Sequence, residues 1–418
     1  MELVSRFDFR RNWFFLALVL GILIYPISGP LDDGVLALLR PASVGAMFFG
    51  VVGVVVIVLA YVAGPIIDRS PRHRLASQAI GALFLLGAFI LLPWYGEIFP
   101  YVTLLKLTIA LQFVMVIVGI NLLTGFTGQI SLGQGAFFAL GGYALAIASF
   151  REWSIPWGVS LLIAPVLTGV LGFLVGIPAL RFKGLYLALA TLALAVTVTP
   201  IAKRFEDFTG GVQGIAMFGK VKPLGPFSDQ ADHFFYYLSL GAATVMLLVV
   251  WNIMQGRLGR ALIAIRDNET AAAAMGINVS LYKTTVFGIA AAFAGLAGAL
   301  NAATIQFVSP DQYSVLLSIR LFAGAVVGGV ASVSGAIVGG LFTQFISDVT
   351  SGITRAAPDA IQAFILIVFM YAMRGGFAGF VHETWRYGRS GLRLQKPRAA
   401  SAERAAPAAE SAPATTYD

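Results

Sequence analysis

The sequence predicts an all-α fold, a polytopic bundle of about 10–12 transmembrane helices. Of its 418 residues, 58% are hydrophobic and only 11% are charged, whereas soluble globular chains carry about 25% charged residues. The hydrophobic residues also form runs of about 17–23, which are long enough to cross a hydrocarbon core of roughly 30 Å. A transmembrane β-barrel would instead show short alternating segments, and the sequence has none.

The first apolar run follows basic residues, but it is long and no small-residue cleavage site follows it, so we expect a retained helix. Lys and Arg gather in the loops on the side of the N-terminus, which predicts that both chain termini are cytoplasmic. This pattern is typical of a multi-pass membrane protein. We expect spans near 13–29, 44–66, 75–93, 101–123, 132–150, 157–178, 185–201, 234–254, 284–306, 314–330, 333–350 and 359–374.

The chain divides into three expected regions. Residues 1–100 form an N-terminal extension with about three transmembrane helices, and residues 101–375 form the core domain. Residues 376–418 end in a stretch rich in Ala, Pro, Ser and Glu without an apolar period, which predicts a disordered cytoplasmic tail.

The stretch Asn121 to Ala146, NLLTGFTGQISLGQGAFFALGGYALA, places glycines and polar side chains at membrane depth. Irregular backbone survives in a membrane only where protein shields it or where it lines a cavity, so we expect a broken or re-entrant segment. Two interpretations stay open: glycine packing with glutamines bonded across a helix interface, or a polar lining of a translocation path with aromatic walls. The residues concerned are Gln129, Ser131, Gln134, Phe137, Phe138 and Tyr143.

A second glycine-rich stretch contains a short internal repeat: GAVVGG at 324–329 is followed by the similar GAIVGG at 335–340. One continuous helix over 314–350 would be about 55 Å long, too long for a single span. We therefore expect a break near Ser332–Ser334 and either two spans or a hairpin. The glycines, which would share one face of a continuous helix, indicate either close helix packing or direct substrate contact.

The residues that usually carry catalysis are missing or scattered. There is no cysteine, and the three histidines (His73, His233 and His382) have no partner at metal-ligand spacing. We therefore expect no enzyme activity, no metal and no cofactor. Asp348 is the only carboxylate candidate inside a span, so proton or cation coupling has no obvious site. Uphill transport would then need energy from a partner.

The predicted inner loop 256–283, GRLGRALIAIRDNETAAAAMGINVSLYK, is a candidate contact for such a partner. Its apolar Leu262 and Ile265 have helical spacing, and Asp267 to Glu269 can cap a helix. Gly276 suits a helix stop in the left-handed conformation. We expect a short helix, a glycine break and re-entry into the next span. The loop is either a lever that transmits force or an ordinary solvated connector.

Two stretches carry a family resemblance: TGFTGQISLGQGAFFALGGYALA and GRALIAIRDNETAAAAMGINVSLYKTTVFGIAAAFAGLAGAL. Together they resemble the membrane subunits of branched-chain amino acid ABC importers, over roughly residues 101–375. The length and the additional N-terminal spans resemble the LivM-type subunit. The resemblance implies a permease of the bacterial inner membrane for leucine, isoleucine and valine. ATP hydrolysis would occur on partner subunits. The implied partners are a second, LivH-type permease subunit, two cytoplasmic ATPases, an extracytoplasmic amino-acid-binding protein and membrane lipid, without nucleic acid.

The resemblance also implies that the inner loop is the coupling helix that docks on an ATPase. Ala271, Ala272 and Gly276 fit the E-A-A-x-x-x-G pattern of such loops, but Thr270 stands at the Glu position and no I-x-L-P follows. The implied coupling residues are Arg266, Asp267, Asn268, Glu269, Ala271, Ala272, Gly276 and Ile277.

Three alternatives remain at the level of sequence. One is a urea or short-amide ABC permease, since those permeases have nearly the same core motifs. Another is a stand-alone secondary carrier or channel, which the missing membrane carboxylates argue against. A scaffold subunit would not need a polar, glycine-rich segment in the middle of the chain.

Overall fold

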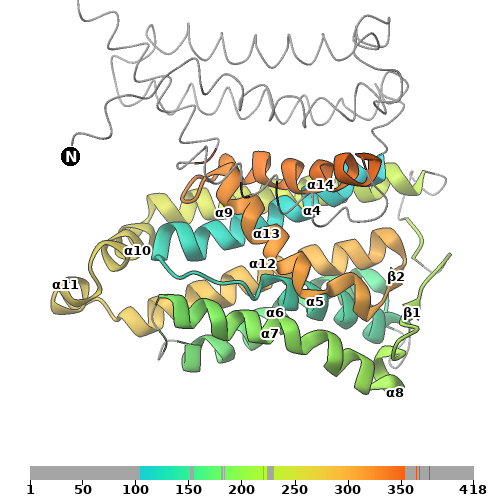
Figure 1. Ribbon diagram of the computed structural model, residues 1–418, viewed down its shortest axis with the longest axis horizontal. Coiled ribbons are helices and arrows are strands. Elements are labelled where there is room, and N and C mark those ends of the chain that lie inside the picture. Colours follow the sequence, from blue (N-terminus) through green and yellow to red (C-terminus); the bar gives the residue numbers. More distant parts are fainter. Residues whose placement is uncertain are drawn as a thin grey trace, which may run out of the picture. The chain divides into compact units, whose positions relative to one another are not determined.

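The computed structural model describes residues 104–150, 155–179, 184–219, 221–223 and 230–353, with isolated positions at 182, 364, 367 and 376. The predicted N-terminal extension lies outside the described residues, as do the span near 359–374 and the tail apart from those positions. In the described part, helices run side by side in a bundle (Figure 1). This arrangement confirms the predicted all-α membrane fold.

Five helices are long and apolar enough to cross a membrane, with 20 to 27 residues each. They follow from runs of Leu, Val, Ile and Ala that contain almost no charged residues. The first of them ends in a π-helical turn, η4. The five are α4 (Leu104–Ile120) with η4 (Asn121–Gly125), α6 (Trp157–Ala179), α7 (Leu185–Arg204), α9 (Ala231–Gln255) and α12 (Val279–Ile305).

Three further helices occupy stretches where the sequence predicts complete spans. They are α5 (Gln134–Phe150), α13 (Val315–Gly328) and α14 (Gly335–Ile353). The 14 residues of α13 cover only about 21 Å, less than a hydrocarbon core. Non-helical backbone precedes both α5 and α13, because residues 128–133 and Ser314 lie outside any helix. The predicted broken segment is therefore confirmed at α5, and α13 is shorter than predicted.

Helix α12 lies at the centre of the described bundle and packs against α4, α5 and α6. Its contact face consists of small residues, and Ala290, Ala294 and Ala297 have no exposed surface. Small side chains let neighbouring helices approach closely, which is how membrane helices gain packing energy without a hydrophobic driving force. The core of the described bundle is thus built from backbone-close contacts around α12.

The two glycine-rich repeats form the α13–α14 hairpin. The chain breaks between Gly328 and Gly335, which confirms the predicted break near 332–334. A methyl group added at Gly328 would collide with the backbone of Gly335, and one added at Gly339 would collide with the backbone of Gly324. The two sets of glycines therefore face each other across the hairpin, instead of sharing one face of a continuous helix. Close packing is the role that the structure gives them.

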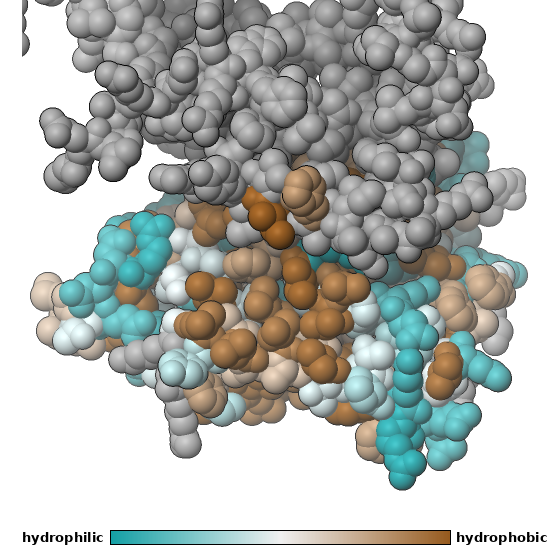
Figure 2. Space-filling model, in the orientation of Figure 1, coloured by the Kyte–Doolittle hydropathy of each residue, from teal (hydrophilic) through white to brown (hydrophobic). Residues whose placement is uncertain are grey.

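The two ends of the described bundle differ. One end, called here the loop end, carries α10 (Arg257–Asp267) and α11 (Glu269–Ala274). The other, called here the sheet end, carries α8 (Glu206–Thr209), β1 (Ile215–Ala216), β2 (Phe307–Val308) and the 3₁₀ turn η6 (Pro310–Tyr313). β1 and β2 are antiparallel, with Ile215 opposite Val308. Figure 2 shows hydrophobic residues across the middle of one face and hydrophilic residues toward both ends, as expected for a membrane-embedded bundle.

Candidate functional site

The glycine-rich segment leaves the helical path after η4 and re-enters the bundle as extended backbone (Figure 1). Gly128 has φ +73°, a conformation that favours glycine. The Leu132 N–H donates to the hydroxyl of Thr191 at 2.9 Å. Because Thr191 is six residues into α7, this bond lies about 9 Å from the start of that helix. Helix α5 therefore begins inside the bundle, where surrounding helices shield the irregular backbone.

All six residues that the sequence singled out in this segment are buried, none more than 6% exposed. Four of the six form two groups in the structure. Gln129 and Phe137 lie toward α12, where the ring of Phe137 meets that of Phe287 with centroids 5.9 Å apart. Ser131 accepts a local bond from the N–H of Gly133. The second group, Phe138 and Tyr143, lies along α5 toward Tyr313 of η6. Gln134 is the first residue of α5.

Tyr313 of η6 faces the second group, and Ser318 of α13 lies against Gly135. The sequence interpretation missed both residues. The ring of Tyr313 lies 5.9 Å, centroid to centroid, from both Phe138 and Tyr143. A signal was available, because Ser309 and Gln312 form a reciprocal capping box around Pro310. That signature predicts an ordered turn immediately before α13, and this turn carries Tyr313 against α5.

The predicted inner loop folds as two helices where the sequence suggested one. Leu262 and Ile265 of α10 are buried against the bundle, as their spacing predicted. The Asn268 side chain then accepts from the Ala271 N–H and caps α11, so the chain turns there. Gly276 has φ +83°, and the N–H of Ile277 donates to the carbonyl of Ala272, which ends the helix in a Schellman motif.

The remaining predicted coupling residues are mostly at the surface. Ala272 is buried, Glu269 and Ile277 are partly buried, and the others are exposed; these are Arg266, Asp267, Asn268, Ala271 and Gly276. Met275 is 84% exposed at the end of α11. The loop end therefore presents a small, mostly apolar helix that projects from the bundle (Figure 1).

A direct contact joins the inner loop to the glycine-rich segment. The Arg266 guanidinium donates to the carbonyl oxygen of Gly125, the last residue of η4, at 3.0 Å. The same turn contacts the α13–α14 hairpin, since the Asn121 amide donates to the Ser332 carbonyl at 2.9 Å. A methyl group at Gly125 would collide with Ala331. The two features that the sequence identified separately therefore meet at one place, together with the hairpin turn.

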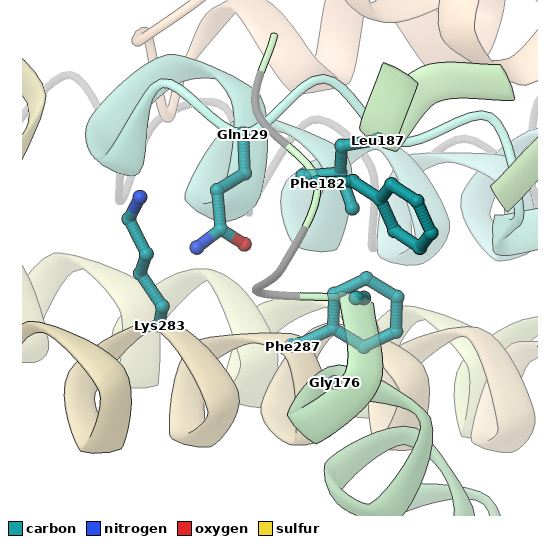
Figure 3. A pocket seen from close by; sticks show the side chains of 7 residues that line it. Gln129, Gly176, Phe182, Leu187, Lys283 and Phe287 are labelled. Carbon is teal, nitrogen blue, oxygen red and sulfur yellow. The ribbon is translucent and has the colours of Figure 1, made fainter. Parts of the chain in front are cut away.

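A second contact links the loop to the start of α12. Glu269 of α11 forms an ion pair with Lys283, whose side chain is only 12% exposed. Lys283 also lines a small pocket with Gln129, Phe287 and Leu187. In Figure 3 the Gln129 amide points toward the space between Lys283 and Phe287. Among the residues that the structure describes, the amide nitrogen of Gln129 has no hydrogen-bond partner.

A family model described as "Branched-chain amino acid transport system / permease component" matches residues 102–373. The chain belongs to this family. The match covers the described helices and includes both the broken segment and the inner loop. The resemblance that the two motifs indicated is thereby confirmed.

The chain is also similar to transport permeases that have been named. The LivM permease protein of the Escherichia coli high-affinity branched-chain amino acid transport system is 32% identical over 54% of this chain and 58% of its own length. The corresponding LivH protein is 23% identical over 65% of this chain and 92% of its own. The ribose import permease protein RbsC of Haemophilus influenzae is 24% identical over 65% and 81%. The chain thus spans less than two thirds of the LivM relative, and no solved structure matches it.

Proposed function

We propose that this chain is a LivM-type membrane subunit of an ABC importer for branched-chain amino acids. It would form half of the translocation path with a LivH-type subunit. Two ATPases would dock at the loop end, which we place in the cytoplasm, and an amino-acid-binding protein would dock at the opposite end. ATP would be hydrolysed on the partner ATPases. Support comes from the family and from the similarity to LivM and LivH.

The single observation that carries the mechanism is the hydrogen bond from Arg266 to the carbonyl of Gly125. It connects a projecting surface loop to the point where α4 ends and the extended segment begins. Movement of α10 would therefore act directly on the backbone that leads to α5. The hairpin turn at Ala331 packs against the same residue, so the movement would also reach α13.

Helix α11 has the properties of a docking element. Only Ala272 of its six residues is buried, and the exposed Met275 follows it. Exposed apolar residues at the tip of a short helix suit a groove on a partner. The capping bond at Asn268 and the ion pair between Glu269 and Lys283 hold this helix against the bundle. A push on α11 would thus be transmitted to α12 instead of being absorbed by a flexible loop.

The test is reconstitution of the complete importer in proteoliposomes, with leucine uptake and ATP hydrolysis measured together. Uptake of leucine that depends on ATP and on the binding protein is the expected result. Urea and short amides serve as competing substrates in the same assay. Uptake by this chain alone without ATP, or uptake of urea but not of leucine, would show that the proposed function is wrong.

Arg266→Ala tests the coupling contact. We expect the ATPase stimulation by the loaded binding protein to fall at least threefold, because a hydrogen bond from a charged group contributes about 1.5–3 kcal/mol and this one is partly solvent-screened. Arg260→Ala is the matched control, since Arg260 lies on the same helix and is exposed. Among the described residues its guanidinium donates only to the nearby Gln255 carbonyl. Equal stimulation in the two variants, with normal assembly, would contradict the coupling role.

A further inference from the structure

The first turn of α5 carries polar groups that the protein leaves without partners. Gln134, the first residue of the helix, is 1% exposed. Neither its amide nitrogen nor its amide oxygen has a hydrogen-bond partner among the described residues. Leaving a buried polar group unsatisfied costs about 1–3 kcal/mol, so such groups require an explanation.

Ser318 of α13 is a second unpartnered polar group, and it lies directly against this turn. Its side chain is 2% exposed, and its hydroxyl oxygen has no hydrogen-bond partner among the described residues. A methyl group at Gly135 would collide with that hydroxyl oxygen. Ser318 is therefore aimed at the backbone of the α5 terminus, and the absence of a side chain at position 135 allows this approach.

The electrostatics of the turn favour an anion. The first N–H groups of a helix have no intrahelical acceptor, and together with the helix dipole they act as roughly half a positive charge. No Asp or Glu occurs in α4, α5, α6, α7, α12 or α13. Because α5 begins inside the bundle, water is also excluded from this terminus. Broken membrane helices present their N-termini to anionic substrate groups in this way.

We propose that the first turn of α5, together with Gln134 and Ser318, binds the carboxylate of the transported amino acid. This site rests on the proposed function and specifies where the substrate is recognised within the membrane. The Ala136 N–H already donates to the Gly133 carbonyl at 3.0 Å. The other first-turn N–H groups, the Gln134 amide and the Ser318 hydroxyl supply the donors that a carboxylate requires. The carboxylate is common to leucine, isoleucine and valine, so one site serves all three substrates.

The aromatic residues farther along α5 suit the remainder of such a substrate. Phe138 lies one helical turn beyond Gln134 on the same face, about 6 Å away along the helix axis. Its ring contacts that of Tyr313, with centroids 5.9 Å apart. An aliphatic side chain of four carbons or fewer spans a similar length. The carboxylate end and the apolar end of the substrate thus meet matching surfaces in order along α5.

The test uses the absence of cysteine from the chain. In the purified importer without its binding protein, Ser318→Cys introduces one thiol into this subunit, and its alkylation by N-ethylmaleimide is followed by mass during ATP turnover. We expect alkylation to proceed, and millimolar L-leucine to slow it at least threefold. 3-Methylbutylamine, which lacks the carboxylate, should give no protection. Ser160→Cys is the control, because Ser160 of α6 is 1% exposed and its hydroxyl accepts a hydrogen bond from Ser149 of α5 at 2.8 Å.

Two results would overturn the carboxylate site: a Ser318→Cys thiol that reacts no faster than the Ser160→Cys thiol, or equal protection by leucine and the amine.

Transport provides an independent check. Ser318→Ala should lower the maximal leucine uptake about fivefold without lowering the melting temperature, since the Ser318 hydroxyl has no hydrogen bond to any described residue that the change would remove. If the unaltered importer takes up no leucine, the proposed function fails. If it does and Ser318→Ala and Gln134→Leu transport normally, only the site fails.

Discussion

Replacing Gly298 with alanine adds a single methyl group, and it should destabilise the protein more than the same addition at the surface of a helix. Gly298 lies on α12 where that helix crosses α5. An added Cβ atom would lie 2.6 Å from the carbonyl carbon of Phe138, and it would meet the carbonyl oxygen more closely still. Ordinary contact begins at 3.4 Å. The obstacle is backbone, which no rotamer change can move aside.

The magnitude follows from two opposing effects. The shortfall is 0.8 Å at the carbonyl carbon, from 3.4 Å minus 2.6 Å, and larger at the oxygen. Relieving it requires α5 and α12 to separate, and overpacking of this kind costs about 3 kcal/mol at the upper end of its range. Alanine in place of glycine within a helix contributes about 1 kcal/mol in the other direction. We therefore expect Gly298→Ala to lower the free energy of unfolding by about 2 kcal/mol. Gly241→Ala in α9 is the matched control, because nothing lies within 4 Å of its Cβ position, and it should gain about 1 kcal/mol.

The assay is equilibrium unfolding in mixed micelles, titrated with a denaturing detergent and followed by circular dichroism. The two single-methyl variants should differ by about 3 kcal/mol, which is far outside the error of such titrations. Equal stabilities for Gly298→Ala and Gly241→Ala would refute the conclusion that α5 and α12 are in backbone contact. Equal stabilities would also contradict the conclusion that the glycines of α5 and α12 allow these helices to pack closely.

Two further changes test local parts of the fold. Gln112→Leu should lower the free energy of unfolding by about 2 kcal/mol, since Gln112 accepts from Asn301 at 2.9 Å and donates to Thr304 at 3.0 Å. In the same titration Thr108→Ala, which removes an intrahelical bond, should change the stability little. Equal losses in the two variants would contradict the hydrogen-bond network of Gln112, Asn301 and Thr304. Asn268→Ala should cost α11 about 1 kcal/mol and Asn268→Gly only a few tenths, seen as faster amide hydrogen exchange in α11 of the alanine variant; identical exchange would show that the cap does not hold this helix.

Local signals in the sequence correctly predicted most of the helices that the structure describes. Long apolar runs with few charges identify membrane helices because no water is present to satisfy an exposed backbone. Gly276 was predicted as a left-handed helix stop and has that conformation, since the requirement depends only on its own backbone. The break between α13 and α14 followed from length alone, because 37 residues of helix would be too long for one span.

The arrangement of the site depended on contacts between residues far apart in the chain. Arg266 bonds Gly125 from 141 positions away, and no local pattern encodes that pairing. The start of α5 could not be predicted from the sequence either, because the extended backbone before it donates a hydrogen bond to Thr191 of another helix. Polarity identified Gln134, but Ser318 looks like any small residue of an apolar helix. Only the packing of α13 against α5 places the Ser318 hydroxyl at the first turn of α5. A buried hydroxyl indicates a binding site only when the surrounding protein excludes water and offers it no hydrogen-bond partner, and this depends on the tertiary structure.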